Sequence, residues 1–127
     1  MKRPSHKELK RKIETARRLL AAGRWAAAAS EKLWANFAEL NLFLPAEQRS
    51  ALRAALAELE PEFYCGTRPP TRSYEPAAKD AEMFAFVWQS RHFGKAMYCK
   101  WAIGGSGTSA RLILFSLHPS RRQGGIQ

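Results

Sequence analysis

Four side chains in the last third of this chain have chemistry that could act together on a phosphodiester. They are Arg91, Tyr98, Lys100 and His118. A histidine titrates near neutral pH and can take or give a proton, and the two cations can bind phosphate oxygens. Tyrosine could orient a hydroxyl group or relay a proton. RNA cleavage without a metal needs a base for the 2′-hydroxyl, an acid for the leaving 5′-oxygen and cations for the phosphate. These residue types predict that chemistry.

Strands are predicted to position these residues, because the sequence changes to β character after Glu82. The apolar runs predict strands at 83–88, 96–103 and 111–117, a turn at 91–95 and a glycine-rich hairpin loop at 104–109. Strict alternation along the last strand separates Ile113, Phe115 and Leu117 from Leu112, Leu114, Ser116 and His118.

The register of the last two strands decides whether the reactive side chains meet. An antiparallel pairing with Tyr98 opposite Ser116 and Ala96 opposite His118 places Tyr98, Lys100 and His118 on one face. His118 and Tyr98 are then diagonal neighbours, roughly 7–8 Å apart between the two backbones and within reach of long side chains. Other even registers change the diagonal but keep these faces together. The opposite, more apolar face is predicted to pack on helices.

Helices are predicted in the first half of the chain. Ser5 and Glu8 form a capping box before a helix that Gly23 ends, Ser30 caps a second helix, and Pro45 begins a third. We therefore expect one α+β domain over residues 1–127, with N-terminal helices packed on a C-terminal antiparallel β-meander. Its helical part is expected at about 5–60 and its β part at about 82–118, followed by a loose tail at 119–127.

Composition narrows the class of protein. The chain has 127 residues, 46% of them hydrophobic, and a formal net charge of +10, with basic ends and an acidic middle. This distribution favours a polyanion or an acidic protein as the partner. No apolar run is long enough for a membrane span, so we expect a cytoplasmic protein with no membrane partner. Cys65 and Cys99 lack metal-ligand spacing, and neither a metal nor a cofactor is expected; Cys99 is predicted to be a buried thiol.

Each candidate residue also has a plain structural interpretation. His118 could be a surface histidine at a strand end, and Tyr98 could pack on the sheet with its hydroxyl at the rim. Lys100 could protect an edge strand from aggregation, and Arg91 could neutralise an acid such as Glu82. Three further basic residues are candidates for holding RNA: Arg68 and Arg72 in a proline-rich loop, and Lys95 in the turn.

Residues 16–118 resemble the MqsR-type mRNA-interferase toxins, members of the wider RelE-like ribonuclease fold group. The likeness is carried by a helical run and four short motifs: Ala38-Glu39-Leu40-Asn41-Leu42, Glu62-Phe63-Tyr64, Trp88-Gln89, Tyr98-Cys99-Lys100 and Phe115-Ser116-Leu117-His118. The resemblance implies a RelE-like fold, with Tyr98 at an active-site tyrosine and Gln89 at an active-site glutamine. Two of the family's lysines are replaced here, by Cys65 and by His118. Some RelE-like nucleases also place a histidine near the C-terminus.

Two functions remain open from the sequence. The first is the toxin of a toxin–antitoxin pair: a metal-independent endoribonuclease that cuts mRNA, alone or on the ribosome, and is bound by a cognate antitoxin. The second is a non-catalytic RNA- or protein-binding regulator that uses the same basic face. A DNA-binding helix pair is less favoured, because the stretch after Gly23 is too long for a tight helix-turn-helix and the second helix is not basic.

Overall fold

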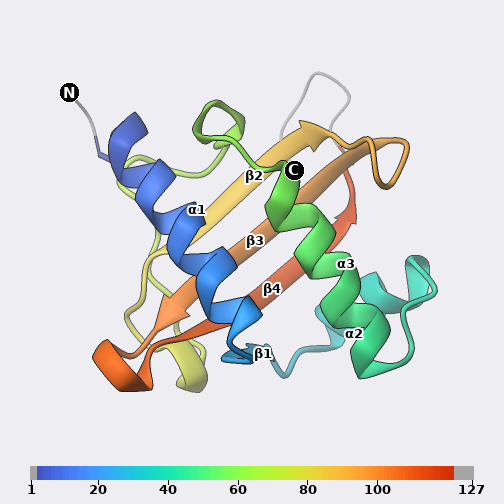
Figure 1. Cartoon of the computed structure of the whole chain (residues 1–127), viewed down its shortest axis with the longest axis horizontal. Helices are drawn as coiled ribbons and strands as arrows, with labels where there is room; N and C mark the ends of the chain where they lie inside the picture. Colours follow the sequence, from blue (N-terminus) through green and yellow to red (C-terminus); the bar gives the residue numbers. More distant parts are fainter. Residues whose placement is uncertain (1–2, 122–127) are drawn as a thin grey trace.

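A computed structural model of the chain describes residues 3–121. Helices α1 and α3 lie across one face of a four-stranded sheet (Figure 1). The helices are α1 (His6–Ala21), α2 (Glu31–Glu39) and α3 (Pro45–Glu58), and the strands are β1 (Trp25–Ala27), β2 (Met83–Gln89), β3 (Ala96–Gly104) and β4 (Arg111–Pro119). The predicted α+β class and the order of helices before the main strands are confirmed. Residues 122–127 of the predicted tail lie outside the described part, and Pro119 belongs to β4.

The helices begin as their capping residues predict. The Ser5 hydroxyl accepts the backbone N–H of Glu8, and the Ser30 hydroxyl accepts that of Leu33. Pro45 occupies the first turn of α3, where its missing N–H costs no hydrogen bond. Gly23 has a φ of +75°, and this left-handed residue follows the C-cap of α1.

The sheet is mixed, with the strand order β1-β4-β3-β2. The predicted antiparallel meander is confirmed for β2, β3 and β4, but the sheet as a whole is not purely antiparallel, because the unpredicted β1 pairs parallel with β4. Only three residues form β1, and alanine has low strand propensity, so the local sequence does not indicate a strand. It forms because the outer edge of β4 offers unpaired backbone groups. Further along this edge, the Asn36 side-chain oxygen of α2 accepts the Leu117 N–H at 3.0 Å.

The helix face of the sheet carries the larger part of the core. Phe86 and Trp101 stack there with ring centroids 5.7 Å apart, and the Lys12 ammonium of α1 lies over the Phe84 ring. Cys99 is fully buried on this face, as predicted. Burial of this apolar surface is the main stabilising contribution in a domain of this size.

A β-bulge in β4 changes which side chains share a face. Trp101 pairs with Leu114, but its neighbour Lys100 pairs with Ser116, so Phe115 is an extra residue. The predicted strict alternation is therefore wrong: Leu114 and Leu117 both lie on the helix face. Without the extra residue, His118 would point toward the helices.

Candidate functional site

The side of the sheet away from α1 and α3 carries two rows of aligned side chains. We call it the outer face and define it by the rows Val87–Tyr98–His118 and Ala85–Lys100–Ser116, each running across β2, β3 and β4. Tyr98, Lys100 and His118 thus share one face, as predicted. The predicted pairing of Tyr98 with Ser116 is wrong by two residues, because the hairpin loop and the bulge set a different register.

Tyr98 and His118 form a stacked pair at the centre of the first row. Their ring centroids are 5.0 Å apart and their planes differ by 23°. Directly opposite residues of an antiparallel pair approach more closely than diagonal ones. The observed register therefore makes the phenol and the imidazole direct neighbours, where the predicted register made them diagonal ones.

The hydrogen bonding of His118 assigns its neutral tautomer. Its Nδ1 lies 2.7 Å from the carbonyl oxygen of Pro119. A carbonyl can only accept, so Nδ1 carries the proton and Nε2 carries the lone pair. The pKa of His118 is lowered, mainly by burial, although the bond to Pro119 acts in the opposite direction. The ring is therefore held as a neutral base around neutral pH.

Tyr98 supplies an acid beside the His118 base, and Lys100 supplies a cation. Burial raises the pKa of the Tyr98 phenol to about 12, so this group keeps its proton and can donate it. The pKa of Lys100 is lowered by burial and, to a smaller degree, by the charge of Lys32 on α2. A base, a protonated acid and a cation are thus adjacent on one sheet face.

Ser116 and Lys32 belong to this surface although the sequence did not single them out. The Ser116 hydroxyl is buried opposite Lys100 and has no hydrogen-bond partner within residues 3–121. Lys32 acts electrostatically on both Lys100 and His118. Alternation along β4 could have indicated Ser116. Lys32 could not have been found, because its approach depends on how α2 packs.

Charges around the His118 end of the outer face are mostly positive. Arg121 forms an ion pair with Glu39 at 2.8 Å, and Lys95 also acts on Glu39. Glu39 in turn acts on His118. Because one glutamate faces several cations, this surface keeps an excess of positive charge, which favours a polyanion as the ligand.

Of the other predicted site residues, Gln89 lies next to the Tyr98–His118 pair and Arg91 does not. Gln89 lies on the outer face at the exposed end of β2, opposite Ala96 and diagonal to Tyr98. Arg91 is exposed in the β2–β3 turn, and the structure does not bring it to the Tyr98–His118 pair.

The two arginines of the proline-rich loop make other contacts. Arg68 donates to the Pro4 carbonyl and covers the Tyr64 ring, while Arg72 donates to the Asp80 carbonyl. These two arginines form no contact with the stacked pair.

Glu58 holds the β2–β3 turn against the last turn of α3. Its carboxylate accepts hydrogen bonds from the Trp88 indole, the Ser90 hydroxyl and the backbone N–H groups of Arg91 and His92. Burial alone would raise its pKa, but the four hydrogen bonds lower it to about 2. The alternative interpretation of Arg91 was that its side chain neutralises an acid such as Glu82, but Glu82 pairs with Arg3. Arg91 instead donates its backbone N–H to Glu58.

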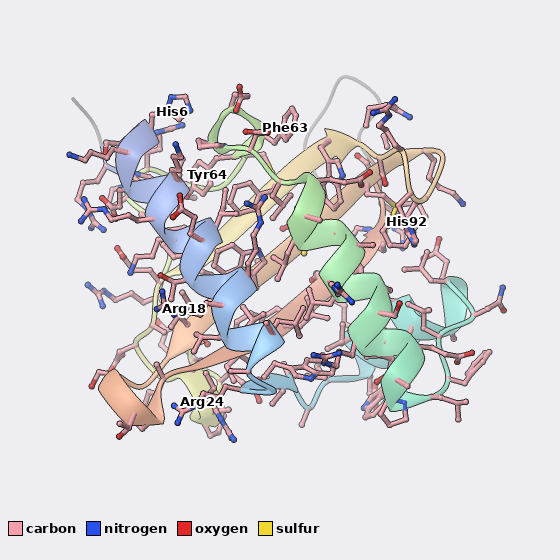
Figure 2. All side chains as sticks on the ribbon, viewed as in Figure 1. His6, Arg18, Arg24, Phe63, Tyr64 and His92 are labelled. Carbon is pink, nitrogen blue, oxygen red and sulfur yellow. The ribbon has the colours of Figure 1, made fainter. Side chains whose placement is uncertain are left out.

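Metal-ligating groups do not gather in residues 3–121: no three histidine, cysteine, aspartate or glutamate side chains lie close enough to hold an ion. His6 and His92 lie on opposite sides of the molecule (Figure 2). In the same part of the chain, no helix is both long and apolar enough to cross a bilayer.

Comparisons of the chain with protein-family models, with curated proteins and with solved structures find no significant match. The resemblance to MqsR-type toxins therefore stays a prediction that rests on the short motifs alone.

Proposed function

We propose that this chain is a metal-independent endoribonuclease whose reaction takes place on the outer face. One observation carries the proposal: a neutral histidine, whose Nε2 carries the lone pair, stacks on a protonated tyrosine beside two lysines. These are the base, the acid and the cations that metal-free RNA cleavage requires.

The proposed reaction is an internal transfer of the phosphoryl group. His118 Nε2 takes the 2′-hydroxyl proton, and the 2′-oxygen forms a bond to phosphorus. The bond from phosphorus to the 5′-oxygen breaks, and that oxygen receives the Tyr98 phenol proton. Lys100 and Lys32 stabilise the negative charge on the phosphate. The products are a 2′,3′-cyclic phosphate and a 5′-hydroxyl, and proton return from His118 to Tyr98 through solvent restores the enzyme.

We further propose that mRNA is the substrate and that the chain is the toxin of a toxin–antitoxin pair. This role is supported by the motif resemblance, in particular by Tyr98-Cys99-Lys100 and Trp88-Gln89. Gln89, Arg91 and Lys95 lie toward the turn end of the sheet and would hold the RNA beyond the scissile bond. Arg68 and Arg72 would contact more distant nucleotides.

A second candidate is a non-catalytic RNA-binding regulator that uses the same surface. The observation that favours it is the burial of His118, which is only 5% exposed. A general base must come within hydrogen-bond reach of the hydroxyl it deprotonates. A regulator would need only the lysines at the surface.

The test is cleavage of a mixed-sequence RNA in EDTA by the wild type and by Tyr98→Phe, which keeps the stacked ring and removes only the hydroxyl. We expect Tyr98→Phe and His118→Ala each to lower the cleavage rate by about 10²-fold or more. His92→Ala is the control, because this exposed turn histidine is not part of the stacked pair. Absence of cleavage by the wild type, with or without ribosomes, would overturn the enzyme and leave the regulator. Equal rates in all variants would remove these residues from the chemistry.

A further inference from the structure

A groove between α1 and α3 lies on the opposite side of the sheet from the Tyr98–His118 pair. Its volume is about 430 Å³. It is lined by Arg17, Leu20, Ala21, Arg49, Arg53, Leu56 and Ala57. The two helices lie in front of the sheet in Figure 1, so a molecule bound between them would leave the outer face uncovered.

Two of the three arginines are held in place by helix ends. Arg17 donates its Nε to the Leu56 carbonyl at 2.8 Å and its Nη2 to the Leu59 carbonyl at 3.0 Å. Arg49 donates its Nη2 to the Leu20 carbonyl at 3.3 Å. Each helix thus supplies an arginine that satisfies C-terminal carbonyls of the other helix. Because each guanidinium carries five N–H donors, both keep donors for a ligand.

The third arginine has no such structural role. Arg53 makes no hydrogen bond or ion pair with any residue between 3 and 121, and no acid is among the residues that line the groove. Arg53 is exposed and lies one turn of α3 beyond Arg49. The groove therefore combines three guanidinium groups with the exposed methyl groups of Ala21 and Ala57, while Leu20 and Leu56 are buried in the core.

We propose that this groove binds an acidic amphipathic helix of a partner protein. Carboxylates at helical spacing would pair with the guanidinium forks, and aliphatic side chains would pack against the exposed Ala21 and Ala57. The exposed alanine methyl groups beside the arginines favour a protein over RNA, because a phosphate backbone has no apolar side chains to pack against them. The proposal is independent of the cleavage reaction, since the two surfaces lie on opposite sides of the sheet.

The probe is a fluorescein-labelled helical peptide of about 15 residues, with glutamates at i, i+4 and i+8 beside leucines at i+3 and i+7. Fluorescence anisotropy measures its binding to the full chain, and a scrambled peptide of equal composition is the control. Arg53→Glu tests the groove. Arg18→Glu is the matched variant, because Arg18 carries the same charge on α1 but lies on the side away from α3 (Figure 2).

We expect saturable binding of the ordered peptide in preference to the scrambled one. Arg53→Glu should weaken that binding by about tenfold or more, and Arg18→Glu should change it by less than about threefold. The proposal is overturned by the absence of binding, by equal losses in the two variants, or by equal binding of the scrambled peptide. It is also overturned if single-stranded RNA competes for the groove and loses affinity only in Arg53→Glu.

Discussion

Replacement of Glu58 by glutamine tests how the β2–β3 turn is held. The carboxylate accepts four hydrogen bonds, two of them from the backbone N–H groups of Arg91 and His92. An amide has one acceptor oxygen and one donor nitrogen, so Glu58→Gln presents a donor to groups that are themselves donors. We expect the variant to be destabilised at neutral pH.

The lowered pKa of Glu58 sets how much the carboxylate contributes to the free energy of unfolding. Its pKa falls from 4.5 to about 2 on folding, which corresponds to at most about 3.4 kcal/mol of stabilisation at neutral pH. The carboxylate is partly exposed to water, so we expect about 1–2 kcal/mol. Because the pKa is lowered on folding, this stabilisation is complete above about pH 4.5 and is lost as the pH falls through about 2.

Urea denaturation measures the effect through the free energy of unfolding. We expect Glu58→Gln to lower that free energy by about 1–2 kcal/mol near pH 7 and by much less near pH 2. Glu60→Gln is the control, since the Glu60 side chain accepts no hydrogen bond within residues 3–121. The reasoning is refuted if Glu58→Gln loses as much stability near pH 2 as near pH 7, or no more than Glu60→Gln at either pH.

Two further predictions concern the proton chemistry of the outer face and the edge of β4. The rate of RNA cleavage should rise with pH to a plateau, with a midpoint below pH 6.5 because the pKa of His118 is lowered. At high pH the rate should fall again as Lys100 loses its proton, with a second midpoint below pH 10.5 because the pKa of Lys100 is also lowered. An acid midpoint above 6.5 in the pH–rate profile would contradict the assignment. Asn36→Ala removes the acceptor of the buried Leu117 N–H and should lower the free energy of unfolding by about 1–3 kcal/mol in urea denaturation. A change no larger than that of the exposed Ala35→Ser in the same helix, a substitution with a small effect on helix propensity, would show that water replaces the amide.

Local sequence patterns predicted most of the elements because their signals act over a few residues. Ser5 and Ser30 cap the helices they precede, and the three main strands lie where alternation and the glycine-rich loop indicate them. The predicted sharing of a face by Tyr98, Lys100 and His118 is also confirmed. Their catalytic role stays a prediction, since geometry alone does not test activity.

The register of β4 could not be predicted from alternation. Leu114 and Leu117 are both fully buried on the helix face, but an odd separation cannot place both there in a regular strand. The bulge at Phe115 resolves this conflict. Since Ile113 and Phe115 are also apolar, the sequence does not reveal which set of side chains is buried against the helices.

By itself, the sequence determined the positions of the helices, the positions of the main strands and the excess of positive charge, because these depend on neighbouring residues and on composition. Only the tertiary structure decided the stacking of Tyr98 on His118, the approach of Lys32 and the anchoring of the turn by Glu58. Each of these joins residues far apart in the chain, for example Glu58 and Arg91. Such contacts depend on how strands register and how helices pack, and no local pattern encodes that choice.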